Sequence, residues 1–425
     1  MSLFKGEFLK SNKGNLIKNT AMLYILQFST YFFSFITVPY QTRILGPDVY
    51  GKLGFATAVM VYFQLFLDFG FMLSATAKIS HNRNDKEFIS KISTCVTVIK
   101  VIFSIVSIAI LVGLCITVPQ FGSDSKLMLL FLFATIFNSL MPDYLYRGIE
   151  QMTTITVRTL LIKMFFTAMI FVFLKGPNDY YIIPVLNIIG NLGALLGVYV
   201  HLFLKLKIPF CKVKLREILE ELKESSSFFL SRIATTVYTT SNTVILKFLS
   251  NSNVDVGYYT SADKLVTTSK SALSPISDSI YPYMIKHKDF KLIKKTLKIF
   301  MPIIIVFAII GFIFAPEICG LIFGPEFRPV APIFRALLPV IVITLPNYIL
   351  GFPTLGAMGL AKYANISIVV GTIVHIVLLI SLYFMGYLNV VTLGVLTSIS
   401  EFSILSYRCF VIYKNRHLFN CGVDN

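Results

Sequence analysis

Polar and charged residues gather in one stretch of an otherwise apolar chain, residues 225–279. The first half of the stretch contains Arg232 among Ser, Thr and Tyr residues, and the second half contains Asp263, Lys264 and Lys270. A charge at the centre of a bilayer costs roughly 2.5–3.5 kcal/mol on insertion scales, so polar membrane helices face each other or face water. We therefore predict a water-filled cavity within the membrane, with positive charge on its wall. Such a wall indicates a transporter whose cargo is anionic.

The spacing of the charges in the second half decides which of them share a helix face. Asp263 and Lys270 are seven residues apart and lie on one face, whereas Lys264 projects about 100° away from Asp263. One interpretation is a hydrated cationic wall that holds phosphate or an acidic sugar. The alternative is that Asp263 pairs with a neighbouring cation and only locks two helices together.

Two residues in other parts of the polar surface are further candidates for binding the cargo. The Arg232 guanidinium suits bidentate binding of phosphate, but the side chain could equally extend to the inner headgroups. Gln27 belongs to a polar stripe on the first predicted span, which we expect to face the seventh span. The other members of this stripe are Ser29, Thr30, Ser34, Thr37 and Gln41.

Asp68 is the lone acid in a strongly apolar span. In lipid it must be protonated or paired. It therefore either carries a coupling proton or neutralises Arg232 or Lys264. Asp68 and Asp263 are our candidates for coupling transport to an H+ or Na+ gradient. Lys100 lies within reach of the cytoplasmic interface, and we interpret it as extending to the headgroups.

The composition assigns the chain to the polytopic membrane proteins. Hydrophobic residues make up 56% and charged residues 14% of the chain, against about 25% charged residues in globular proteins. The net charge of +17 falls in short clusters between apolar runs, which is typical of membrane topology signals and not of a nucleic-acid surface. The cysteines and histidines are scattered without metal-ligand spacing. No nucleotide loop or hydrolase motif is present, so we predict neither enzyme activity nor a cofactor.

The apolar runs predict an all-α protein of about twelve transmembrane helices. The predicted starts lie near Asn19, Tyr50, Thr94, Lys126, Ile155, Tyr180, Ser226, Val256, Thr296, Pro332, Tyr363 and Val390. The basic loop 205–224 would join an N-terminal six-helix bundle, residues 1–210, to a C-terminal one, residues 211–425. Lys and Arg are enriched in every second loop, which predicts that both termini are cytoplasmic.

Two segments form a faint internal repeat. Residues 43–56 and 247–262 each contain a basic residue, a short outside loop, an Asp-Val pair and a helix start with Gly and Tyr. Both follow an odd-numbered span, so the two halves are parallel. Transporters often build a central site between two such halves.

The repeat segments carry a resemblance to a known family. Thr42-Arg43-Ile44-Leu45-Gly46-Pro47-Asp48-Val49-Tyr50-Gly51 resembles the outside loop of Wzx-type oligosaccharide flippases, as do Val256-Gly257-Tyr258-Tyr259-Thr260-Ser261-Ala262-Asp263-Lys264 and Ile322-Phe323-Gly324-Pro325-Glu326-Phe327. In order and spacing, these segments resemble the polysaccharide-transporter branch of the multidrug/oligosaccharidyl-lipid/polysaccharide (MOP) exporter superfamily.

The resemblance implies two six-helix bundles around a central cationic cavity, lined mainly by spans one, two, seven and eight. It implies alternating access in a bacterial cytoplasmic (inner) membrane. The implied cargo is an undecaprenyl-diphosphate-linked oligosaccharide for O-antigen, capsule or exopolysaccharide synthesis. Membrane lipids, a polymerase and a chain-length regulator of the same pathway are the expected partners of a functional monomer.

Two other functions stay open at this point. A drug–cation antiporter of the same fold should present acids to its cargo, whereas the polar residues here are net basic. A membrane polysaccharide polymerase or ligase would carry a large outside loop rich in Arg and His, whereas the outside loops here are short.

Overall fold

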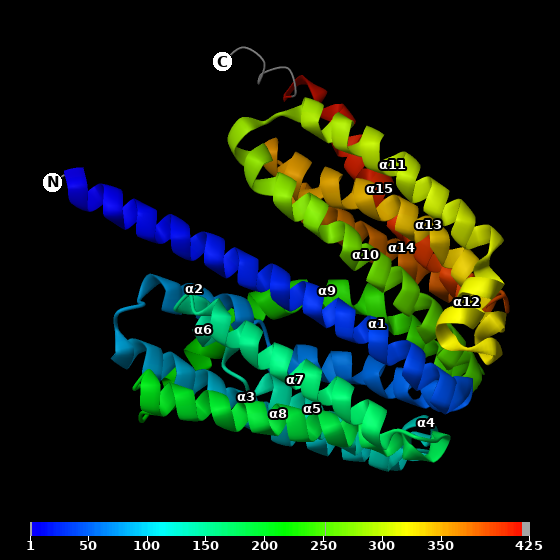
Figure 1. Ribbon diagram of the computed structural model, residues 1–425, viewed down its shortest axis with the longest axis horizontal. Coiled ribbons are helices and arrows are strands. Elements are labelled where there is room, and N and C mark those ends of the chain that lie inside the picture. Colours follow the sequence, from blue (N-terminus) through cyan, green and yellow to red (C-terminus); the bar gives the residue numbers. More distant parts are fainter. Residues whose placement is uncertain (1, 251, 419–425) are drawn as a thin grey trace. The chain divides into compact units, whose positions relative to one another are not determined.

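The computed structural model describes residues 2–250 and 252–418, although the side chains of residues 2–20, of Leu23 and of several positions in 230–239 are outside that description. This part of the chain is helical and contains no strand. It divides into two compact units (Figure 1). The first unit comprises Met1–Leu45 and Ala56–Ile233, and the second comprises Gly46–Phe55 and Ala234–Asn425. The predicted boundary near residue 210 lies before α9 (Leu215–Ser250), whereas the observed division falls inside it.

Helix α1 (Ser2–Asp68) contains the first two predicted spans in one 67-residue element. Its backbone is non-helical at Gly46, with φ 67° and ψ 173°. A positive φ is readily adopted by glycine and is strained for other residues. Gly46 is also where the chain passes from the first unit to the second.

The first unit is built from helices that follow the predicted spans closely. They are α2 (Phe71–His81), α3 (Lys86–Thr117), α4 (Pro119–Gly122), α5 (Ser125–Ser139), α6 (Asp143–Gly148), α7 (Met152–Phe173), η1 (Pro177–Tyr181), α8 (Ile182–Val200) and η2 (His201–Lys205). Helix α8 packs against both α5 and α7, and α3 packs against α5.

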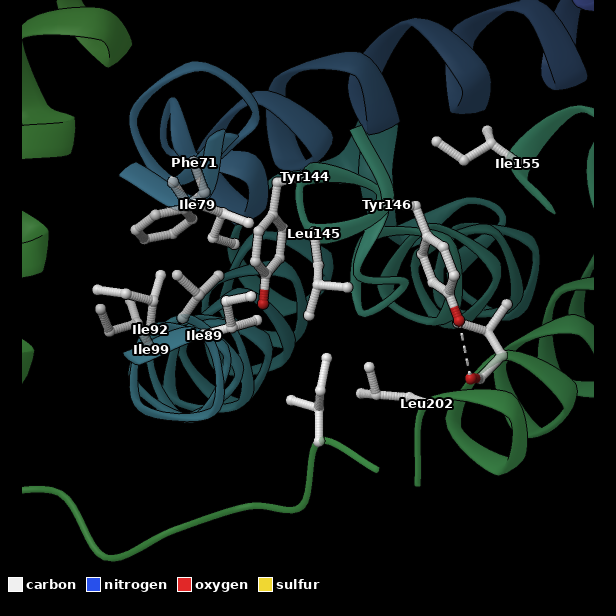
Figure 2. Packing of buried hydrophobic residues seen from close by; sticks show 14 of the residues in the cluster. Phe71, Ile79, Ile89, Ile92, Ile99, Tyr144, Leu145, Tyr146, Ile155 and Leu202 are labelled. Atoms are coloured by element: carbon white, nitrogen blue, oxygen red, sulfur yellow. Dashed lines mark hydrogen bonds between the residues drawn. The ribbon is translucent and has the colours of Figure 1, made fainter. Parts of the chain in front are cut away.

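Aromatic and β-branched side chains form the core of the first unit. Phe71, Ile79, Tyr144 and Tyr146 are among its fully buried members, and Figure 2 shows them on α2 and α6. The Tyr146 hydroxyl donates to the Val198 carbonyl oxygen at 3.3 Å. A buried tyrosine needs such a partner for its hydroxyl, and this bond ties α6 to α8.

The second unit contains five long helices, seen side by side in Figure 1. Its elements after α9 are α10 (Asn253–His287), α11 (Phe290–Ile313), α12 (Ala315–Phe323), η3 (Pro325–Val330), α13 (Ala331–Ile349), η4 (Leu350–Gly356), α14 (Ala361–Phe384) and α15 (Val390–Lys414). Helix α13 packs against α10, α11 and α15, and α14 packs against α15.

Nine segments of the described chain are long and apolar enough to cross a membrane. The first, Tyr24–His81, is 58 residues long and contains most of predicted spans one and two. Helices α9 and α10 are too polar to be among the nine, but they are 36 and 35 residues long. The predicted set of about twelve spans is consistent with these elements. Large apolar side chains on α3 and α11, such as Ile105 and Phe307, are exposed, as expected for surfaces in contact with lipid.

Candidate functional site

Helix α10 carries most of the predicted binding residues, and its polar side chains are partly satisfied within the helix. The hydroxyls of Ser261, Thr267 and Thr268 donate to backbone carbonyl oxygens four residues earlier, at 2.7 to 2.9 Å. Such bonds let hydroxyl groups exist in an apolar environment. The hydroxyl residues alone therefore do not require a water-filled cavity, and only the charged residues of α10 indicate a binding site.

Asp263 and Lys264 are half-buried neighbours on α10. Residues i and i+1 of a helix do not face each other, so the two groups interact across the helix surface without forming a direct ion pair. Among the described residues, no carboxylate oxygen lies within 4 Å of the Lys264 ammonium. Asp263 also lies within electrostatic range of Lys270. Lys264 is thus a partly buried cation whose charge is not neutralised by a direct contact with a described residue.

Lys270 has a different environment. Its ammonium lies 2.6 Å from Glu401 Oε1 of α15, and the side chain of Glu401 is only 7% exposed. Asn347 of α13 donates to the second carboxylate oxygen at 2.9 Å. The charge of Lys270 is therefore neutralised inside the second unit. The sequence contained a signal for this pair, because Glu401 is a lone acid in the last span, but helix periodicity could not show which cation it meets.

Beyond Glu401, α15 also contacts a break in the helix between α13 and α14. Arg408 of α15 donates to the backbone oxygen of Asn347 and, at 2.8 Å, to Ser367 Oγ. The adjoining π-helical segment η4 is non-helical at Gly351, and a Cβ there would lie 2.9 Å from the Arg408 guanidinium. Arg408 thus fills the space beside the break and bonds the carbonyl group next to it.

A second buried network surrounds His375 of α14. Its ring nitrogens lie 3.0 Å from Ser400 Oγ and 3.0 Å from Asn242 Oδ1. The Asn242 amide donates to Tyr259 at 2.8 Å and to Thr397 at 2.9 Å. Four helices, α9, α10, α14 and α15, meet in this network.

Asp68 lies in the first unit. It is the lone acid of its predicted span, but it has polar partners on other helices. Its carboxylate accepts hydrogen bonds from Gln64 at 2.9 Å and Ser139 at 3.2 Å, and it lies 3.5 Å from the Lys100 ammonium. The interpretation of Lys100 as a residue extending to the headgroups is wrong, because Lys100 is 5% exposed and its ammonium lies beside Asp68. Within the first unit, the cation beside Asp68 is Lys100 and not the predicted Arg232.

The remaining candidates also lie in the first unit. Arg232 of α9 is exposed, and no described carboxylate lies within 4 Å of its guanidinium. The neighbouring side chains of Ser231, Thr235, Tyr238 and Thr239 lie outside the described residues. Gln27 of α1 is exposed and donates to the Tyr31 hydroxyl at 3.0 Å.

The start of α9 contributes a separate charged contact, outside the predicted spans. Lys78 of α2 lies 2.7 Å from Glu221 and 2.6 Å from Glu224. Burial raises the pKa of the Glu221 carboxyl, and the Lys78 ammonium opposes that rise. The contact joins α2 to α9 within the first unit.

The three segments that carried the family resemblance meet in one place in the second unit. A Cβ on Gly51 of α1 would lie 1.8 Å from the backbone oxygen of Asn253, and a Cβ on Gly257 of α10 would lie 2.1 Å from that of Pro47. Only glycine permits so close a crossing of two backbones. The Phe327 ring of the third segment contacts both Tyr50 and Tyr258.

Polar contacts hold the same crossing. Asn253 donates to Asp48 at 3.1 Å and accepts from Lys247 at 2.6 Å. The Tyr258 hydroxyl donates to the Glu326 carbonyl at 3.3 Å. We name this cluster, formed by residues 46–55, 247–250, 252–260 and 324–327, the three-motif junction. Sequence comparison detected its parts, but their contact was not expected.

A family model described as "Polysaccharide biosynthesis protein" matches residues 16–288, which is more than half of the chain. The chain belongs to the polysaccharide biosynthesis protein family. A "Putative O-antigen transporter" of Escherichia coli (strain K12) is 26% identical over 80% of this chain and 83% of its own length. This family membership confirms the sequence resemblance.

Two solved structures share the fold of this polysaccharide biosynthesis protein. An inward-facing MATE family multidrug transporter of the MOP superfamily has a TM-score of 0.67 and 16% identity, covering 94% of this chain and 98% of its own. The lipid II flippase MurJ, in an inward closed conformation, has a TM-score of 0.67 and 15% identity, covering 93% and 87%. The predicted fold class, an all-α membrane protein with the MOP fold, is confirmed. These relatives are transporters, in agreement with the prediction that the chain is not an enzyme.

Proposed function

We propose that this protein translocates an undecaprenyl-diphosphate-linked oligosaccharide from the cytoplasmic leaflet of a bacterial cytoplasmic membrane to the opposite leaflet. The family and the relative named as an O-antigen transporter support a polysaccharide or lipid-linked cargo. The MurJ-like fold supports movement of a lipid. Alternating access is part of the proposal, because MATE family transporters of this fold have been solved in an inward-facing and in an outward-facing conformation.

The observation that carries the proposal is the contrast between Lys264 and two other membrane lysines, Lys100 and Lys270. The ammoniums of Lys100 and Lys270 lie beside carboxylates of other helices, whereas that of Lys264 has no described carboxylate within 4 Å. A half-buried cation without a direct carboxylate contact costs free energy to hold in place, and an anionic ligand would offset that cost. The diphosphate of the proposed cargo is such a ligand, and a charged hydrogen bond to it is worth about 1.5–3 kcal/mol.

The test is glycan display in cells that depend on this protein. Lys264→Ala should abolish display at normal protein levels in the membrane, and Lys264→Arg should restore part of it, because Arg keeps the charge but changes its shape. Full display by Lys264→Ala would refute the binding role. A defect explained by loss of the protein from the membrane would indicate that Lys264 only stabilises the helix.

The proposed energy source is an H+ or Na+ gradient, with Asp68 and Asp263 as the coupling acids. Transport in proteoliposomes should respond to an imposed gradient, and Asp68→Asn or Asp263→Asn should remove that response. Equal wild-type rates with and without both gradients, or a full response in both variants, would refute the coupling.

The orientation is proposed from the distribution of Lys and Arg. Ser123 and Asn84 are both exposed residues beside helix ends of the first unit, which makes them a matched pair for labelling. In a cysteine-free background, an impermeant thiol reagent added to intact cells should label a cysteine at 123 and miss one at 84. The opposite pattern would reverse the proposed topology.

A further inference from the structure

A groove of about 690 Å³ runs between α7 and α8 in the first unit. Its walls are largely apolar, and two of its lining residues, Leu161 and Ile189, are 59% and 52% exposed. Both helices are membrane-span candidates with most of their surface exposed. The groove therefore opens on a surface that contacts the hydrocarbon of the bilayer.

The polar lining residues of the groove gather at one end. Thr153, Thr154 and Arg158 come from the first turns of α7, and His201 follows the last residue of α8. The rest of the lining comes from Val157, Leu161, Ile162, Phe165, Ile189, Gly190, Gly193, Ala194, Gly197 and Val198. The groove thus has a polar end followed by an apolar stretch, which matches the polar headgroup and apolar chain of a membrane lipid.

Glycines on α8 provide the room along the groove. Nothing lies within 4 Å of the position that a Cβ on Gly193 or Gly197 would occupy, whereas a Cβ on Gly190 would lie 3.2 Å from Ile162. Glycine inside a helix costs about 1 kcal/mol relative to alanine. Because contacts with the described protein do not require glycine at 193 or 197, we infer that the space above them accommodates a group from outside the chain.

That group must be apolar along most of its length. Water occupies a cavity only where it finds polar partners, and an unfilled space loses the dispersion contacts of its walls. In a bilayer, the hydrocarbon chain of a lipid is apolar and can fill the space.

The charge balance at the polar end distinguishes between classes of lipid. The Arg158 guanidinium donates to both carboxylate oxygens of Asp143, at 2.7 and 3.0 Å, and His201 shares a 2.9 Å hydrogen bond with Tyr146. A diphosphate, with several negative charges, requires cations that are not already paired. The polar end instead offers hydroxyl groups beside a neutral ion pair, which suits the ester and phosphate oxygens of an ordinary phospholipid.

We propose that this groove is a binding site for one acyl chain of a membrane glycerophospholipid, with its headgroup beside Thr153 and Thr154. No lining residue of the groove comes from α10, and the site does not depend on the proposed cargo. Its occupant supports α7, of which only Ile155, Thr156 and Ile170 are fully buried.

The test measures phospholipid retained by the purified full-length protein, with phosphatidylethanolamine as the probe and native mass spectrometry as the readout. Gly193→Leu fills the groove. Gly113→Leu on α3 is the matched control, because Gly113 also has nothing within 4 Å of its Cβ position but does not line the groove. Gly193→Leu should lower retention about tenfold, equivalent to about 1.4 kcal/mol, and Gly113→Leu should match wild type. The double variant Thr153→Val, Thr154→Val should also lower retention.

Several outcomes would overturn the proposal. Equal retention by the Gly193 and Gly113 variants would show that the groove holds no particular lipid. A dimer that Gly193→Leu dissociates would show that a second copy of the chain occupies the groove, since Gly193 and Gly197 have the spacing of a helix-dimer motif. Displacement of the phospholipid by an equal amount of a polyprenyl phosphate would assign the groove to the cargo's chain. Gly193→Leu should keep the helical circular dichroism and the monodisperse elution of wild type, which separates lost binding from misfolding.

Discussion

Each unit has a candidate coupling acid with a lysine beside it, but the acid and the lysine face each other only in the first unit. In the first unit, Asp68 and Lys100 come from different helices, lie 3.5 Å apart and share Ser139 as a further partner. In the second unit, Asp263 and Lys264 are adjacent on one helix and cannot turn toward each other. The first arrangement uses the charges to hold helices together, and the second leaves a cation for a ligand.

The same distinction separates two lysines of α10. Lys270 lies 2.6 Å from Glu401, and Lys264 has no such partner among the described residues. The lesson is that the presence of a lysine in a polar span does not identify a binding residue. Its availability depends on which acid the packing of other helices brings to it.

The largest expected effect on glycan display comes from replacing Lys264, the cation available to a ligand. Lys264→Ala should reduce glycan display by more than tenfold, because it removes a charged contact worth about 1.5–3 kcal/mol. Quantitative blotting of surface glycan, normalised to protein in the membrane, measures the effect. If Lys264→Ala and Lys270→Ala impaired display equally at normal protein levels, the distinction between the two lysines would be lost.

The buried pair of the first unit should affect stability more than binding. Lys100→Met should destabilise the protein by about 1–3 kcal/mol, because it leaves the partly buried Asp68 carboxylate without its cation. Adding Asp68→Asn should recover part of that loss. Thermal unfolding of the purified protein measures both, and a double variant whose loss equals the sum of the two single losses would contradict a direct interaction.

The Lys270–Glu401 pair offers a matched measurement in the second unit. A double-mutant cycle with Lys270→Met and Glu401→Gln should give a coupling energy of about 0.5–3 kcal/mol, the range for residues in contact. A coupling energy near zero would mean that the pair does not stabilise the fold. Lys270 would then become available for cargo binding, as the sequence first suggested.

The stability of the three-motif junction should be sensitive to the addition of a single methyl group. Gly51→Ala should destabilise the protein by about 1–3 kcal/mol, because the added methyl group overlaps the Asn253 backbone and forces the helices apart. Gly193→Ala is the control, and it should be neutral or slightly stabilising, because its Cβ position is open. Equal melting temperatures for the two variants would contradict the tight crossing at Gly51.

The sequence predicted the helices well because apolar length and flanking charges depend on local composition. The predicted start at Val390 coincides with that of α15, and the start near Lys126 lies within one residue of that of α5. Partners across helices were harder to predict. The sequence leaves Asp68 either carrying a coupling proton or neutralising Arg232 or Lys264, whereas the structure places Lys100 beside it. Side-chain pairing depends on the rotation and depth of packed helices, which periodicity does not determine.

The resemblance between residues 43–56 and 247–262 was interpreted as a repeat, and the structure adds a physical reason for the shared glycines. Gly51 and Gly257 lie at the crossing of their two helices. That contact could not be predicted from either segment alone. The π-helical break at η4 was also missed, because its partner Arg408 lies more than fifty residues away along the chain.

Arg232 is the least constrained of the candidates, since it is exposed. Arg232→Ala should lower glycan display moderately, by less than Lys264→Ala, because an exposed guanidinium is already well solvated and gains less from binding an anion. An effect larger than that of Lys264→Ala would move the main binding role to α9.

The central claim, that Lys264 binds the anionic part of the cargo whereas Lys270 is neutralised by Glu401, is tested most directly by binding. The affinity of the purified protein for undecaprenyl diphosphate would be measured for wild type, Lys264→Gln and Lys270→Gln in the same detergent. The account predicts that Lys264→Gln weakens binding by about tenfold to a hundredfold, from the 1.5–3 kcal/mol of one charged hydrogen bond, and that Lys270→Gln changes it by less than threefold, within about 0.6 kcal/mol. Unchanged affinity in Lys264→Gln, or a larger loss in Lys270→Gln, would contradict it.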